Sequence, residues 1–295
     1  MREKRLLPYL AAGNLSLSDL VNLLTSAEEC GNQHIFLYTC SPADAIHMMD
    51  RARTVATMNR QNLGHLLAGP DVQAMPATPT IVDVRWETAA VDLSMTIKEV
   101  AVHTKPKLLR ERTRSNMIFK VYENVAVRGV NVAKLHRSGL FEIRLQRRDN
   151  TTKYDGDLVR FVRQINEYFP FARFTETSLT KAKDTLWAQR GALVDLIRYT
   201  DASMIDEAGN TVRAATGSDK HDLSQSAAGK SIDYLLDEDK NAYCAESNLW
   251  FVKSDHLGSP IHVLLNGDGN EFALTAKCSA GDYEYVLNQI RHFNR

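Results

Sequence analysis

Cysteine is scarce in this chain. The 295 residues include four cysteines, Cys30, Cys40, Cys244 and Cys278, and no two of them stand in a CxxC spacing. The sequence therefore lacks both the paired cysteines of a zinc-binding ribbon and the regular framework of a small disulfide-rich secreted protein. We expect reduced thiols that pack as small core residues, in a cytoplasmic protein.

Long hydrophobic runs are also missing. No segment approaches the ~20 consecutive apolar residues that a membrane-spanning helix needs. The short apolar run at residues 6–12 contains Pro8 and no convincing cleavage site, so we expect no signal peptide. The sequence predicts no membrane partner.

Motifs for catalysis or cofactor binding are few and incomplete. Gly229-Lys230-Ser231 matches the end of a phosphate-binding loop, but Ser224 occupies the position of the leading glycine. There is no Gly-x-Ser-x-Gly nucleophile elbow, and the spacing of His256 and His262 does not place two metal ligands on one helical face. We expect no cofactor, no metal site and no catalytic residue. The sequence favours a binding protein over an enzyme without deciding the point.

The first sixty or so residues have helical patterns. Apolar residues recur at helical spacing over residues 17–27, after a capping pair formed by Ser16 and Asp19. A second helix is predicted to begin at Ser41-Pro42, because proline suits the first helical position, and to continue through Ile46, Met49 and Ala56. Residues 34–38, between these helices, fit either a short strand or another helical turn.

The rest of the chain alternates strand and helix patterns. Runs of β-branched and aromatic residues predict strands at residues 81–86, 91–100, 117–122, 125–132 and 140–145. Helices are predicted from Asp155 to Pro170 and over residues 179–199. Asn266-Gly267 predicts the turn of a hairpin, and a terminal helix follows it.

Together these patterns predict an α+β protein with three modules. The first is a helical N-terminal module (residues 1–68), joined by a proline-rich linker (69–80) to a basic mixed β-sheet and helix middle domain (81–177). The last is a small acidic C-terminal domain (178–295) that ends in a β-hairpin plus helix.

The overall charge balance hides a segregation of charge. The chain has 36 Lys and Arg and 36 Asp and Glu, yet residues 98–173 hold 17 of the basic residues and only 8 of the acidic ones. The segments on both sides are acidic. A basic middle in a neutral chain indicates a surface that meets an anionic partner, which can be the chain's own acidic ends.

The cations concentrate in two predicted loops and on the polar face of the following helix. The candidate nucleic-acid-binding residues are Lys105, Lys107, Arg110, Arg112, Arg114, Arg147, Arg148, Lys153, Arg160 and Arg163. The first five are expected in a loop at residues 103–114 between two strands. Aromatic residues are few nearby (Phe119, Tyr122 and Phe141), and the strand pattern puts Phe141 in the core, which weakens the case for stacking on single strands.

Three functions remain open. The leading hypothesis is a non-enzymatic nucleic-acid-binding or assembly protein that uses this basic patch within residues 103–163. The first alternative is a protein–protein adaptor that recognises an acidic partner. The second is a metal-dependent nuclease, whose candidate side chains on the predicted strands are Asp83, Glu87, Asp92, Glu142 and Arg144. The choice between DNA and RNA and the oligomeric state stay open.

Overall fold

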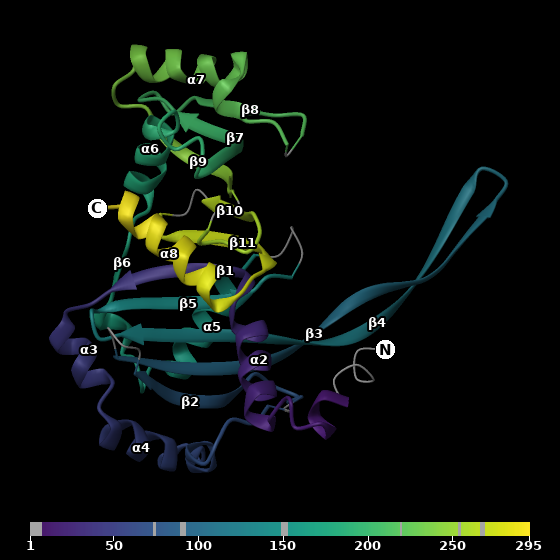
Figure 1. The fold of residues 1–295 in the computed structure, drawn as a ribbon, viewed down its shortest axis with the longest axis vertical. Coiled ribbons are helices and arrows are strands. Elements are labelled where there is room, and N and C mark those ends of the chain that lie inside the picture. Colours follow the sequence, from purple (N-terminus) through teal and green to yellow (C-terminus); the bar gives the residue numbers. More distant parts are fainter. Residues whose placement is uncertain are drawn as a thin grey trace. The chain divides into compact units, whose positions relative to one another are not determined.

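The computed structural model describes residues 8–72, 75–88, 93–148, 153–218, 220–252, 255–265 and 269–295. Helices and antiparallel strands are both present, which confirms the α+β class (Figure 1). None of the described helices is long and apolar enough to cross a membrane. Contacts divide the chain into two discontinuous units. The first unit comprises Met1–Cys40, Leu140–Asp155 and Ala172–Arg295, and the second comprises Ser41–Gly139 and Gly156–Phe171.

The first unit is built on an antiparallel sheet. Its strands are β1 (Gly31–Thr39), β5 (Leu140–Gln146), β6 (Thr175–Glu176), β7 (Ile197–Ile205), β8 (Thr211–Ala215), β9 (Tyr243–Phe251), β10 (Ile261–Leu265) and β11 (Glu271–Lys277). They pair in the order β5-β1-β11-β10-β9-β7-β8, and β6 pairs with the end of β1. The helices of this unit are α2 (Leu17–Glu29), α6 (Thr180–Gln189), α7 (Ala227–Glu238) and α8 (Ala280–Phe293), with a 3₁₀ turn η3 (Leu223–Gln225).

One face of this sheet packs against helices, because the side chains along each strand alternate between the two faces and those on one face are apolar. Ile35 and Leu37 of β1 and Phe272 of β11 point to the same side and are fully buried. Side chains of α6, α7 and α8 complete the same core, among them Trp187 and Ile290. Period-2 burial in the strands and period-3.6 burial in α8 are the patterns that such packing demands.

The second unit has a three-stranded antiparallel sheet in the order β2-β3-β4. Its elements are α3 (Pro42–Met48), α4 (Arg51–Arg60), η1 (Gly64–Leu67), β2 (Thr80–Thr88), β3 (Leu93–Arg114), β4 (Met117–His136), α5 (Asp155–Ile165) and the turn η2 (Phe171–Arg173). Both α5 and η2 extend over a boundary between the units. Val82, Val100, Val130 and Val132 form an apolar cluster in the sheet. Trp86 of β2 donates a hydrogen bond from Nε1 to the carbonyl of Met49, 2.9 Å away, which ties the sheet to the helical segment.

Most predicted elements are confirmed. Ser16 and Asp19 form a full capping box at the start of α2, and residues 34–38, which fitted two interpretations, belong to strand β1. The C-terminal hairpin forms from β10 and β11, while its turn at residues 266–268 lies outside the described residues. The module boundaries expected from the sequence, at residues 68, 80 and 177, stay a prediction.

Three predictions of local structure are wrong. Residues 103–114 are not a loop, because β3 continues to Arg114 and pairs with β4 throughout. The helix predicted over residues 179–199 ends at Gln189, since Gly191 follows and the alternating residues from Ile197 join the sheet as β7. The helix that begins at Pro42 stops at Met48, because Asp50 caps a new helix.

Candidate nucleic-acid interface

Strands β3 and β4 extend beyond the sheet of the second unit as a twisted two-stranded projection (Figure 1). Every residue from 104 to 124 is exposed, and we call this segment the ribbon. The sheet core ends before it, because buried residues in β3 stop at Val100 and those in β4 begin at Gly129. A two-stranded ribbon is at best marginally stable alone in water, so nothing in its own packing accounts for its length.

The ribbon concentrates exposed apolar side chains. Seven large hydrophobic residues on it have substantial exposure: Leu108, Leu109, Met117, Ile118, Phe119, Val121 and Tyr122. Contiguous exposed apolar surface in a folded protein marks a site of interaction with another molecule.

One extra residue in β3 decides which side chains share a face of the ribbon. Leu108 lies opposite Tyr122 and Arg110 lies opposite Val121, so the register shifts at Leu109. Such a β-bulge sets two residues of one strand against one residue of the other. Because side chains alternate between the two faces of a strand, the bulge reverses the alternation along β3.

The bulge brings all five predicted cations of this segment onto a single face. We call them the basic row: Lys105, Lys107, Arg110, Arg112 and Arg114. At roughly 3.3 Å per residue the row is about 30 Å long. None of the five makes an ion pair or a side-chain hydrogen bond with another residue of the described chain. The basic row is therefore available to an external anion.

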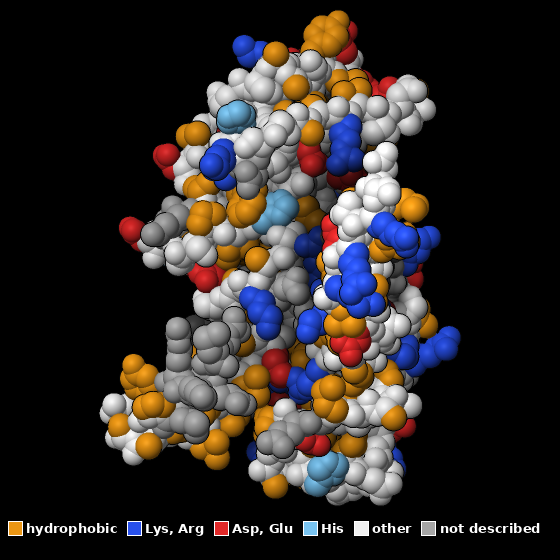
Figure 2. All heavy atoms as spheres, turned by 90° about the vertical axis from the view of Figure 1, so that its right-hand side faces the viewer, with side chains coloured by type: hydrophobic (Ala, Val, Ile, Leu, Met, Phe, Trp, Pro, Cys, Tyr) orange, Lys and Arg blue, Asp and Glu red, His pale blue; other side chains and the backbone are white. Residues whose placement is uncertain are grey.

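Strand β4 supplies the other half of this face. The residues that lie opposite the basic row are Val125, Glu123, Val121, Phe119 and Met117, which we call the apolar row although Glu123 interrupts it. We call the two rows together the cationic face. Figure 2, which looks toward the ribbon, shows Lys and Arg side chains interspersed with hydrophobic ones.

The opposite face of the ribbon has a different chemistry. It carries Leu108, Tyr122 and Ile118, and its charges are a single pair, Glu111 and Lys120. The Nζ of Lys120 lies 3.3 Å from Oε2 of Glu111. This face has no net charge, whereas the cationic face carries the five cations of the basic row and one carboxylate, Glu123.

Two predicted cations lie on α5 of the second unit and have different environments. The guanidinium of Arg160 donates hydrogen bonds to both carboxylate oxygens of Glu99, with an Nη2–Oε1 distance of 2.9 Å. Glu99 is fully buried and also accepts a hydrogen bond from Asn131 at 2.6 Å. Arg160 thus neutralises an internal carboxylate, whereas Arg163 is exposed.

The remaining three predicted cations, Arg147, Arg148 and Lys153, belong to the first unit. The guanidinium carbon of Arg148 lies 5.7 Å from the centre of the Tyr154 ring, and the Tyr154 hydroxyl accepts a hydrogen bond from the Arg148 backbone at 2.8 Å. The ring of His34 stacks on the Tyr154 ring, with 4.1 Å between the two ring centres. Lys153 is exposed.

The described candidate nuclease carboxylates are each engaged by a cation of their own unit. Arg85 holds both Asp83 and Glu87 of β2, with an Nε–Oε1 distance of 2.7 Å to Glu87. Burial tends to raise the pKa of Glu87, but the charges of Arg85 and Lys134 outweigh it and keep this pKa below its usual range. Asp92 lies outside the described residues.

Glu142, the remaining carboxylate, is buried in the first unit against Arg144. Arg144 Nη2 lies 2.8 Å from Glu142 Oε2, and the Tyr283 hydroxyl donates a hydrogen bond to the same carboxylate. Within the described parts of the chain, no group of three or more His, Cys, Asp or Glu side chains is arranged to hold a metal ion.

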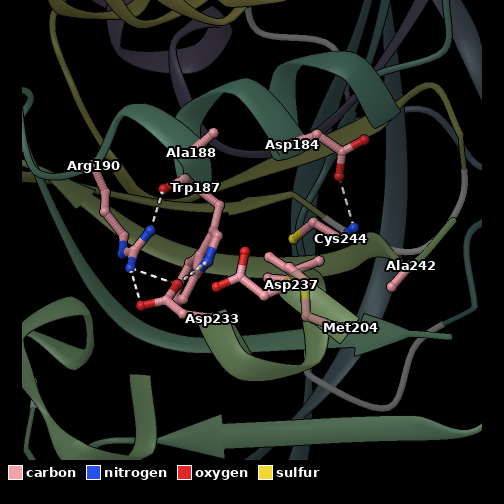
Figure 3. A pocket seen from close by; sticks show the side chains of 10 residues that line it. Asp184, Trp187, Ala188, Arg190, Met204, Asp233, Asp237, Ala242 and Cys244 are labelled. Atoms are coloured by element: carbon pink, nitrogen blue, oxygen red, sulfur yellow. Dashed lines mark hydrogen bonds and ion pairs between the residues drawn. The ribbon is translucent and has the colours of Figure 1, made fainter. Parts of the chain in front are cut away.

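A pocket of about 550 Å³ opens in the first unit between α6, α7 and the strands (Figure 3). Arg190 forms an ion pair with Asp233 and lies 4.4 Å above the Trp187 ring, so its charge is already neutralised. Burial raises the pKa of the Cys244 thiol to about 11, which keeps this thiol protonated and a poor nucleophile at neutral pH. The residues that line the pocket include no histidine.

Comparison with known protein families gave no match for this chain, and no curated protein matched it in sequence. The geometry of the ribbon is therefore the basis on which a function can be proposed. Sequence patterns identified its cations but missed the apolar row. The available signal was the alternation of Met117, Phe119 and Val121, whose face depends on the pairing with β3.

Proposed function

We propose that this protein is a non-enzymatic nucleic-acid-binding protein and that the ribbon is its binding arm. The observation that carries the proposal is the alignment of five cations on one exposed face, none of which forms an ion pair with another described residue. Arg and Lys bind phosphate oxygens, and each phosphate contact releases condensed counterions from the nucleic acid. A row of open cations about 30 Å long supports several such contacts at once.

The proposal is tested with a triple charge reversal, Arg110→Glu, Arg112→Glu and Arg114→Glu. Binding to labelled DNA and RNA is followed by fluorescence anisotropy over a series of salt concentrations. We expect wild-type affinity to fall with salt, with a log–log slope of about −3.5 for five single-strand phosphates or about −4.5 for a duplex. The triple reversal is expected to lower affinity by at least about a hundredfold.

A matched control reverses three exposed cations of the first unit, Lys181→Glu, Lys220→Glu and Lys230→Glu, and changes the net charge by the same amount. It is expected to retain most of the affinity. Equal loss in both triple variants would mean that overall charge matters and the ribbon does not. Binding that ignores salt would contradict the proposal directly.

The second candidate function is an adaptor that recognises an acidic protein. The exposed apolar side chains of the ribbon favour it, because protein interfaces combine an apolar centre with charged edges. A partner recovered in stoichiometric amount after nuclease treatment, and lost in the triple reversal at Arg110, Arg112 and Arg114, would support this candidate instead.

A further inference from the structure

We infer that the cationic face accommodates a single polynucleotide strand, with phosphates along the basic row and bases against the apolar row. This inference rests on the proposed function and specifies its substrate class. It follows from the distribution of the two kinds of side chain, because all five cations come from β3 and all their apolar neighbours come from β4. The face is divided lengthwise, with all five cations on one side.

The division matches one nucleic-acid backbone better than two. A protein that occupies a groove of a duplex meets phosphates along both edges of that groove. Here the second edge of the face carries no cation, and it carries Glu123 opposite Lys107. The Glu123 carboxylate would repel a second backbone, whereas the base side of a single strand has no charge.

The spacing of the rows suits a single strand as well. Paired strands lie about 4.8 Å apart, so a backbone that follows β3 places its bases over β4. Cations two residues apart on one face are separated by about 6.7 Å. That spacing exceeds the 3.4 Å rise per nucleotide of a DNA strand, so each cation of the row can reach a phosphate of its own.

Phe119 is the side chain on this face that can stack on a base. The residue is 49% exposed and lies opposite Arg112, with Met117 and Val121 on either side in the same row. Stacking of a base on an aromatic ring in single-strand binders contributes about five- to a hundredfold in affinity. The planar guanidinium of Arg112 can reach the adjacent phosphate in two-point contact.

The test compares single strands with duplexes of the same sequence. Labelled single-stranded DNA, single-stranded RNA and the corresponding duplexes, each about 20 nucleotides long so that they exceed the 30 Å row, are measured by anisotropy. We expect single strands to bind at least about tenfold more tightly than duplexes. The DNA and RNA arms show which sugar is preferred.

Two aromatic variants then locate the bases. Phe119→Ala is expected to weaken single-strand binding about tenfold without changing the salt slope, since it removes stacking and leaves phosphate contacts intact. Tyr122→Ala is the matched control, because Tyr122 is 54% exposed at a neighbouring position on the opposite face. It is expected to change affinity less than about twofold.

The outcomes separate this inference from the proposed function. If duplexes bind as tightly as single strands, or if both aromatic variants behave alike, the inference is wrong while nucleic-acid binding stands. If neither form of nucleic acid binds and a polyglutamate peptide does, both are wrong and the ribbon recognises acidic protein. Circular dichroism of each variant confirms folding, since both side chains are exposed and neither contributes to the core.

Discussion

Glu99 distinguishes Arg160 from the cations of the basic row, because Arg160 is paired with this buried carboxylate. It has no exposed surface, and its carboxylate is held by Arg160 and Asn131. Removing the partner of a buried charge is strongly destabilising, because the charge remains without compensation. Arg160 therefore contributes to stability, and we leave it out of the proposed interface.

We expect Arg160→Ala to lower the free energy of unfolding by about 2–3 kcal/mol, somewhat less than for a fully buried pair because the Arg160 side chain is one-third exposed. Urea denaturation followed by circular dichroism measures the change. Arg163→Ala, on the exposed side of the same helix, is the control and is expected to cost less than about 0.5 kcal/mol. Equal values for the two variants would show that the Glu99 pair has no special role.

The buried thiol of Cys244 makes stability depend on pH in the alkaline range. Burial raises its pKa to about 11, above the value of about 8.5 for a free thiol. The folded state holds the proton that the unfolded chain loses first. The contribution of Cys244 is therefore complete below about pH 8.5 and is lost as the pH rises toward 11.

Urea unfolding of the wild type and of Cys244→Ala between pH 8 and 11 tests this. Buried tyrosines such as Tyr199 and Tyr283 also have a raised pKa because of burial and add to the alkaline loss in both proteins. The difference between the two proteins isolates the thiol, and it is expected to shrink with pH by on the order of 1–3 kcal/mol. A constant difference would contradict the prediction.

At the scale of elements, the bulge at Leu109 determines the chemistry of the ribbon. Without a register shift, Arg110, Arg112 and Arg114 would face the side opposite to Lys105 and Lys107. The cations would then be split between the faces, and neither face would carry a continuous row.

A variant that keeps composition constant tests the alignment. Exchanging Arg110 with Glu111 and Arg112 with Thr113 moves two cations to the opposite face without altering net charge. We expect weaker nucleic-acid binding and a salt slope reduced by about 1.4, the share of two single-strand phosphates. Salt titration by anisotropy provides the measurement.

Deletion of Leu109 is the control for this exchange. The deletion removes the extra residue but leaves every pair on either side of it in register, so the basic row persists. Binding is expected to remain within about threefold of wild type. If the deletion abolished binding and the exchange did not, the local bend of the ribbon would matter more than the alignment of its cations.

At the scale of the whole molecule, the chain passes between the two units after residues 40, 139, 155 and 171. Neither unit is a continuous segment. Strand β5, inside the predicted middle domain, pairs with β1, which lies outside that domain. The predicted domain 81–177 therefore lacks a partner strand and part of the second unit.

We expect the isolated fragment 81–177 to be without a cooperative unfolding transition, because β5 would present an unpaired edge and the segment around Met49 that binds Trp86 would be missing. Thermal and urea unfolding of the purified fragment, beside the full chain, gives the answer. A sharp transition in the fragment would instead establish residues 81–177 as an independent domain.

Local signals account for what sequence patterns predicted well. The cap at Ser16, the apolar stripe of α8 and the strand patterns of β2 and β5 each depend on residues close together in the chain. The helix predicted over residues 179–199 failed beyond Gln189, because the residues from Ile197 pair with β9, whose sequence lies far away. Long-range pairing overrode a local helical pattern there.

The amino-acid sequence by itself determined the α+β class, most of the elements and the excess of cations between residues 98 and 173. Only the tertiary structure decided that residues 103–114 form a strand and that five of its cations share one face. The physical reason is that the face of a side chain depends on the register with the partner strand. A shift at Leu109 relative to Val121 and Tyr122 reverses that face without leaving any sign in the composition.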